Sequence, residues 1–197
     1  MLPTHRTLRS ELALAVALLA LASSARAGVI KVPGDYNTLQ VAVNNAAQGD
    51  VILIHSGFAA GPVDIVDKAL VLVVDLNGQA TVPQIKIRDL APDHHVVLRG
   101  LGADGNAFPF GPNDAALVVT DCQGRVTVEG STLRGANGWW GGPVTSSGHP
   151  GAQIDDSASV AFSHCLIVGG RGLNTGGDLM PPGSGAAGLD VDNANIS

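Results

Sequence analysis

The sequence predicts an all-β fold, a right-handed parallel β-helix in which short strands wind into a solenoid and a short helix caps the N-terminal end. Composition is the first indication: the 197 residues include 26 glycines, with only 4% aromatic and 14% charged residues. Such a chain favours many short strands joined by tight turns over a helical bundle. The second indication is an internal repeat, and the third is a short amphipathic segment ahead of the first apolar strands.

The first 27 residues have the pattern of a bacterial secretory signal peptide. A basic start is followed by an unbroken apolar run over residues 12–22, and Ala25-Arg26-Ala27 offers the small residues of a cleavage site. The run is too short for an ordinary membrane-spanning helix, which leaves an uncleaved anchor as the alternative. We therefore expect residues 28–197 to form a protein of the periplasm, cell surface or medium, without a membrane span after cleavage.

Removal of this segment makes the chain more acidic. Residues 1–27 contain three of the eleven basic residues and one of the seventeen acidic residues, so the net charge changes from −6 to −8. Such a chain binds nucleic acids and anionic membranes poorly, because both are polyanions. We expect no nucleic-acid partner.

The repeat consists of three segments that align without gaps. Val96-x-Leu98-x-x-Leu101-x-Ala103-x-Gly105 matches the segment from Val126 to Gly135, and both match the segment from Val160 to Gly169. Apolar residues alternate as in strands that bury one face, and glycine follows where a turn needs positive φ. A second series aligns Leu117, Ile154 and Leu189 as inward residues. Columns of equivalent residues that recur after 30 and then 34 residues, as do Val96, Val126 and Val160, are typical of a solenoid.

The start of the mature chain predicts a cap and the first strands. Asn37-Thr38 precede an amphipathic helix over Leu39–Ala47, which Gly49 would end. Buried strands follow at Val51–Ile54 and within residues 63–74. The last residues, 192–197, fall in the middle of a coil and lack a polar cap, so we expect the domain 28–197 to continue or to be incomplete there.

At this point the sequence resembles the pectin-lyase-like superfamily of right-handed β-helix proteins. The resemblance rests on DYNTLQVAVNNAAQGDVILIHSG, followed by VDIVDKALVLVVDLNGQATV, and extends over residues 30–197 as a coil pattern. It implies a secreted repeat protein, in a superfamily that includes pectate lyases, pectin methylesterases and polygalacturonases. A shared fold does not by itself imply a shared activity.

Three aspartates are the candidate metal ligands. The second series places Asp155, Asp190 and Asp192 together on one outward face, on strands about 4.8 Å apart. Stacked carboxylates repel unless a cation such as Ca²⁺ binds them. The alternatives are a solvated acidic face and a calcium site that bridges to an acidic sugar polymer.

Three long segments that follow Gly105, Gly135 and Gly169 form the candidate ligand site. Stacking brings these segments to the same corner, and loops held by a rigid scaffold often bind ligands. Either their aromatic rings stack on sugars or they fold inward as a small apolar cluster. The candidate ligand-binding residues are Phe108, Phe110, Trp139, Trp140, His149 and Arg171.

The catalytic motifs of the superfamily are incomplete in this sequence. Ser147-Gly148-His149 precedes Asp155-Asp156 instead of following it, and Pro150 replaces the glycine expected after the histidine. No catalytic residue is therefore predicted. We expect a secreted, non-catalytic β-helix that binds polysaccharide or a cell-surface partner, with no required cofactor although Ca²⁺ fits the acidic face. The alternative is the N-terminal part of a carbohydrate-active enzyme, a lyase or hydrolase of uronic-acid polysaccharides.

The two cysteines allow two interpretations. Export to an oxidising compartment permits a Cys122–Cys165 disulfide. The inward position of Cys165 in the repeat favours two buried, unreactive thiols instead.

Overall fold

The computed structural model describes residues 27–75, 78–106, 115–138, 147–172 and 184–197. In these residues, three parallel sheets and one short helix make up the regular structure. The all-β, parallel class predicted from the sequence is confirmed. The predicted signal peptide lies outside the described residues, apart from Ala27.

The largest sheet, sheet A, has the strand order β1-β2-β4-β7-β10-β13. Its members are β1 (Val29–Val32), β2 (Val51–Ile54), β4 (Leu70–Val74), β7 (His95–Arg99), β10 (Arg125–Glu129) and β13 (Ser159–Ser163). Sheet B contains β5 (Ala80–Val82), β8 (Leu101–Asp104), β11 (Thr132–Arg134) and β14 (Leu166–Val168). Sheet C contains β3 (Val63–Val66), β6 (Ile85–Arg88), β9 (Leu117–Thr120), β12 (Ala152–Asp155) and β15 (Leu189–Asp192).

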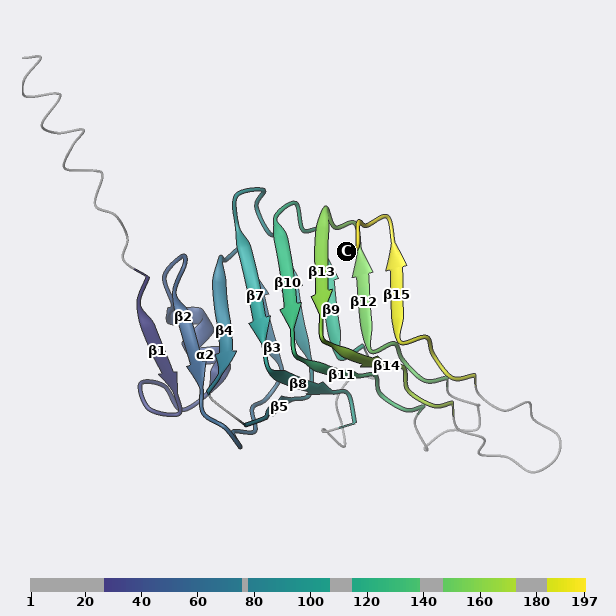
Figure 1. The fold of residues 1–197 in the computed structure, drawn as a ribbon, viewed down its shortest axis with the longest axis horizontal. Helices are drawn as coiled ribbons and strands as arrows, with labels where there is room; N and C mark the ends of the chain where they lie inside the picture. The colour runs from purple at the N-terminus through teal and green to yellow at the C-terminus, as the bar shows by residue number, and fades with distance from the viewer. Residues whose placement is uncertain (1–26, 76–77, 107–114, 139–146, 173–183) are drawn as a thin grey trace, which may run out of the picture.

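From β4 onward, the chain visits sheets A, B and C in turn. Each circuit adds one strand to each sheet, and every strand except β5, the first strand of sheet B, pairs in parallel with the strand of the preceding circuit. The strands therefore lie side by side along the molecule in the order of the sequence, as the colours of Figure 1 show.

The first repeat is confirmed by the strand register. Val126 pairs with Val96 on one side and with Val160 on the other, as the gap-free alignment predicts. Leu133 pairs in the same way with Ala103 and Ile167. The columns of apolar residues in the alignment are thus real neighbours in space.

The second series is wrong by two residues. Ala152 lies between Leu117 and Leu189 in sheet C, whereas the alignment placed Ile154 in that position. A shift by two keeps every side chain on the same face, so apolar alternation cannot detect it.

The signal that sets the register of sheet C is the residue after each strand. In all five strands this residue has a positive φ, and it is an acid or amide, the non-glycine types that adopt such φ values most readily. The five residues are Asp67, Asp89, Asp121, Asp156 and Asn193. The sequence pattern apolar-x-apolar-x-Asp/Asn, aligned on these residues, reproduces the observed register.

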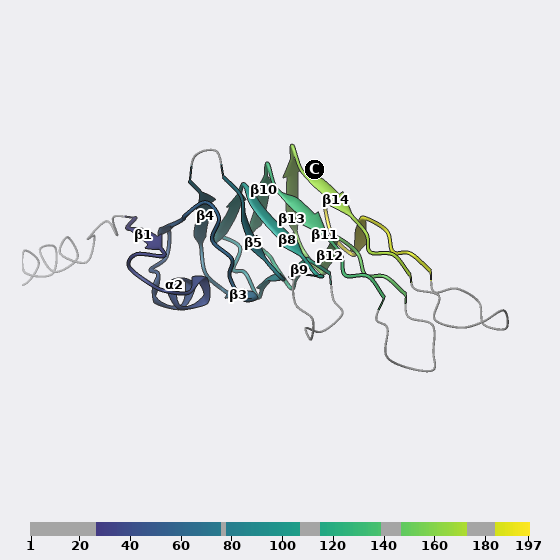
Figure 2. The same cartoon turned by 90° about the horizontal axis from the view of Figure 1, so that it is seen from below.

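The N-terminal helix α2 (Leu39–Asn45) begins as predicted and ends two residues early. Thr38 is its N-cap, with Oγ1 accepting a hydrogen bond from the amide of Val41 at 3.3 Å. Its buried residues, Leu39, Ala42 and Val43, face the first strands of sheets A and C, where the helix covers that end of the molecule (Figure 2).

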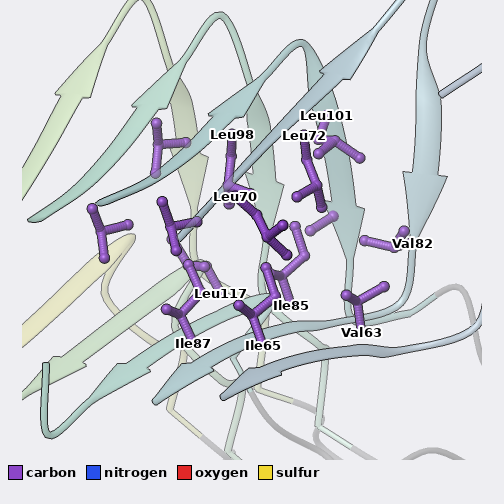
Figure 3. Close-up of a cluster of buried hydrophobic side chains, with 14 of the residues drawn as sticks. Val63, Ile65, Leu70, Leu72, Val82, Ile85, Ile87, Leu98, Leu101 and Leu117 are labelled. Atoms are coloured by element: carbon purple, nitrogen blue, oxygen red, sulfur yellow. The ribbon is translucent and has the colours of Figure 1, made fainter. Parts of the chain in front are cut away.

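Apolar side chains of all three sheets meet in one core. Leu72 and Leu98 from sheet A, Leu101 from sheet B, and Ile87 from sheet C are all at most 1% exposed. Figure 3 shows these side chains pointing toward one another between the sheets. The sheets thus enclose a dry interior, and polar chemistry is confined to the outer faces and the turns.

Candidate functional site

The predicted loops share one base. We call residues 135–138, 147–150, 169–172 and 184–187 the loop base, because the chain between Gly138 and Ser147 and between Gly172 and Ser184 starts and returns there. Figure 2 shows these stems extending together from the sheet B–sheet C corner. The predicted convergence of these segments is present in their described parts.

Backbone hydrogen bonds join the stems across the two segments. His149 N donates to Ala136 O at 2.9 Å, and Gly170 N donates to His149 O at 2.8 Å. Ala186 N then donates to Gly170 O at 3.0 Å. The outgoing and returning stems therefore extend the parallel layers beyond sheet B as one hydrogen-bonded unit.

Asparagine side chains bind successive stems to one another. Asn106 Oδ1 accepts from Asn137 N at 2.8 Å, and Asn137 Oδ1 accepts from Arg171 N at 2.8 Å. Asp104 Oδ1 in turn accepts from Asn106 N at 2.9 Å. Each asparagine oxygen accepts a hydrogen bond from a backbone N–H that lies beyond the end of the strand ladder. These bonds hold neighbouring stems at a constant spacing.

The close approach of the stems depends on glycine. A Cβ atom at Gly170 would lie 1.8 Å from Ala136 O, and one at Gly135 would lie 2.0 Å from His149 O. No side chain fits at these distances, so the glycines permit a contact that larger residues would prevent.

The structure places two of the six predicted ligand residues. His149 is half-buried in the returning stem of the second segment, and Arg171 is exposed at the start of the third. Both belong to the loop base. The residue before Arg171, Gly170, donates its backbone N–H to His149 O. Phe108, Phe110, Trp139 and Trp140 lie outside the described residues.

The predicted acidic face is rearranged by the corrected register. Asp155 lies directly opposite Asp192, while Asp190 lies opposite Gln153. Gln153 Nε2 donates to Asp155 Oδ2 at 2.8 Å, so an amide stands beside the carboxylates. The structure therefore brings Asp155 and Asp192 together. Asp190 lies two residues before Asp192 on β15 and is not opposite a carboxylate.

In the part of the chain that the structure describes, no group of three or more His, Cys, Asp or Glu side chains is placed to hold a metal ion. Ca²⁺ takes six to eight oxygen ligands. Asp155 and Asp192 alone do not supply such a set, so the described residues of this face do not by themselves fit a closed calcium site.

A pocket that the sequence analysis missed lies at the opposite corner, where sheet A passes into sheet B. Its volume is about 500 Å³, within the range of ligand sites. Its lining includes the charged side chains of Asp75, Arg99 and Glu129 and the imidazole of His164. All four residues lie at or directly after the ends of successive strands of sheet A, so the stacking of the circuits brings them together.

The two cysteines are free and differ in exposure. Cys122 is buried, and burial raises the pKa of its thiol above the ordinary value of 9.0. Cys165 is only half-buried, contrary to the expectation of two buried thiols. It precedes β14, which is the last strand of sheet B, so no further layer shields it in the described chain. The alternative Cys122–Cys165 disulfide is not present.

His95 is the histidine of sheet A that contacts another strand. Its Nε2 lies 2.9 Å from Thr127 Oγ1. Burial, and after it the charge of Arg125, lowers the pKa of this imidazole. His94 lies beside the sheet C–sheet A turn, with Nδ1 2.9 Å from Asp67 Oδ1 but outside hydrogen-bonding geometry.

Among the described residues, no helix has the length and apolar character needed to cross a membrane. Comparison of the chain with known proteins gives no matching protein-family model, no matching curated protein and no matching solved structure.

Proposed function

We propose that this chain is an exported right-handed parallel β-helix of the pectin-lyase-like kind, and that it binds polysaccharide or a cell-surface partner without catalysing a reaction. The circuit through sheets A, B and C supports the solenoid. The right hand follows from the strong preference of parallel strand crossovers for that hand. Signal peptide, export and the absence of a nucleic-acid partner remain part of this proposal.

The observation that carries the binding role is the hydrogen-bonded loop base. It holds His149 and Arg171 at one corner, and the segment that contains Trp139 and Trp140 starts and ends on it. A rigid base lowers the entropy cost of presenting several loops to one ligand. Aromatic rings offer flat faces for sugar rings, and Arg171 offers hydrogen-bond donors for hydroxyl or carboxylate oxygens.

Affinity electrophoresis of the exported full chain in gels that contain pectin, polygalacturonate or xylan tests this role. We expect one polysaccharide to retard the protein, and we expect Trp139→Ala with Trp140→Ala to abolish the retardation. Leu166→Ala is the matched control, because Leu166 is an apolar side chain, 55% exposed, on the outer face of sheet B. Equal retardation of all variants, or no retardation by any polymer, would contradict the proposal.

A second candidate is a lyase or hydrolase of uronic-acid polysaccharides, and the direct pairing of Asp155 with Asp192 favours it. Two adjacent carboxylates can share a cation with an acidic polymer. On this hypothesis CaCl₂ raises the Tm of the protein, Asp192→Asn removes that rise, and polygalacturonate is cleaved. A Tm that CaCl₂ does not change, together with no cleavage, would exclude it.

A further inference from the structure

We propose that the sheet A–sheet B corner pocket is a second binding site, for an oligosaccharide that carries amino groups. It is separate from the loop base, which lies at the sheet B–sheet C corner. We call it the corner pocket, and its lining includes Asp75, Arg99, Glu129, Gly130 and His164.

The shape of the corner pocket comes from the turns between the two sheets. Gly100 and Gly130 connect β7 to β8 and β10 to β11 with φ values of 71° and 57°. A Cβ atom at Gly130 would meet nothing within 4 Å, so the floor of the corner pocket at this turn is bare backbone. Polar groups of a ligand can therefore approach the main chain there.

In the next circuit a histidine replaces the glycine. His164 occupies the equivalent turn with a φ of 52°, and its side chain is exposed. A non-glycine residue in this left-handed conformation is strained relative to glycine. Glycine would adopt this φ without strain, whereas the histidine places an imidazole at the end of the corner pocket.

The walls carry charges of both signs, with an excess of carboxylates. Arg99 Nη2 lies 3.4 Å from Glu129 Oε1, and both side chains remain solvent-accessible, at 60% and 38%. Asp75 is held in place, because Ser56 N donates to its Oδ1 at 2.8 Å. Two carboxylates against one guanidinium favour a ligand with ammonium groups and disfavour a uronate chain.

The corner pocket is long in the direction in which the strands stack. Asp75 follows β4, and His164 follows β13, three strand spacings or about 14 Å away. The Asp75 carboxylate lies at one end, the Arg99–Glu129 ion pair in the middle and the His164 imidazole at the other end. This order of groups suits an extended ligand with alternating donors and acceptors. An amino-sugar oligomer has this character: its ammonium groups donate to the carboxylates, and its hydroxyl groups accept from Arg99.

The test is calorimetric titration of the exported full chain with a glucosamine trimer, with trigalacturonate as the comparison ligand. We expect the glucosamine trimer to bind and trigalacturonate not to bind. Glu129→Gln should lower the affinity about tenfold, as expected for the loss of one charge-assisted hydrogen bond. His164→Gly should also weaken binding while raising the Tm, because glycine tolerates this φ.

Controls separate this site from the loop base. Asp93→Asn removes an exposed carboxylate near the opposite end of β7, and it should leave the affinity unchanged. The proposal is overturned if the glucosamine trimer does not bind, or if trigalacturonate binds equally well. It is also overturned if the affinity survives Glu129→Gln and His164→Gly but falls with Trp139→Ala, since the ligand would then occupy the loop base.

Discussion

Asp155 of β12 lies directly opposite Asp192 of β15 in the parallel register of sheet C. Like charges in directly opposed positions of a sheet destabilise it. We therefore expect Asp192→Asn to raise the free energy of unfolding by about 0.5 kcal/mol at low salt. Urea denaturation at low and at high NaCl measures this, and the gain should shrink as salt screens the repulsion.

Asp190→Asn is the matched control for this prediction, because Asp190 faces Gln153 and not a carboxylate. Its effect on the free energy of unfolding should be smaller than that of Asp192→Asn. An equal gain from both substitutions would mean that general charge reduction, and not the Asp155–Asp192 pair, is responsible.

Lys68 stabilises the end of the capping helix α2. Its Nζ donates to the carbonyl oxygens of Val43, Asn44 and Ala46 at 2.9, 3.1 and 2.9 Å. These carbonyls have no partner within the helix, and a cation at a helix C-terminus is favourable. We expect Lys68→Met to lower the free energy of unfolding by about 2 kcal/mol. Lys31→Met, at an exposed position of β1, should cost little in the same denaturation experiment.

The buried thiol of Cys122 makes stability depend on alkaline pH. Burial raises its pKa above 9.0, so the folded state retains the proton that the unfolded state loses. The free energy of unfolding should therefore fall as the pH rises above that value. Cys122→Ala should reduce this fall between about pH 8 and about pH 10 in chemical denaturation. If the free energy of unfolding falls with pH equally steeply in Cys122→Ala and in the unsubstituted protein, the buried thiol is not the cause.

His95 gives a corresponding dependence at acidic pH. Its pKa is lowered below 6.5, first by burial and then by Arg125, so the unfolded state binds a proton more readily. Stability that is present at neutral pH should be lost as the pH falls below 6.5. His95→Gln keeps a polar group near Thr127 without titrating, and its Tm should decline less between about pH 7 and about pH 5. A decline as steep as that of the unsubstituted protein would assign the effect to other groups.

Gly170 is essential to the loop base. Gly170→Ala would place a methyl group 1.8 Å from Ala136 O, so the stem must move. We expect loss of amide exchange protection at Gly170 and Ala186, and a loss of about 2 kcal/mol in stability. Gly61→Ala is the control, because a Cβ there meets nothing within 4 Å. Unchanged protection in Gly170→Ala would contradict the rigid base on which the binding proposal rests.

Part of the architecture follows from local patterns that have direct physical meaning. Val96, Val126 and Val160 recur with the same neighbours, and burial of one strand face makes such columns pair. Thr38 before an amphipathic segment predicts α2 because its hydroxyl can cap a free N–H group. The glycine-rich composition predicts many short strands joined by tight turns, because small residues let layers stack closely.

The candidate sites were less predictable, and the acidic face shows why. Apolar alternation has a period of two, so it could not distinguish the pairing of Asp192 with Asp155 from a register shifted by two residues. The repeated Asp or Asn at positive φ was the better signal, since only a few residue types accept that conformation. His149 and Arg171 were correctly assigned to one corner because glycine marked the start of each segment.

The sequence by itself determined the class of fold, the first repeat and the capping helix, because each depends on local periodicity and on contacts between adjacent circuits. The tertiary structure decided the register of sheet C, the partners of Asp155 and the corner pocket around Glu129 and His164. These features depend on which residues meet across a circuit of 30 or more residues, as with Asp155 and Asp192. Apolar alternation does not encode that separation, because turns of different lengths absorb it before the strands pair.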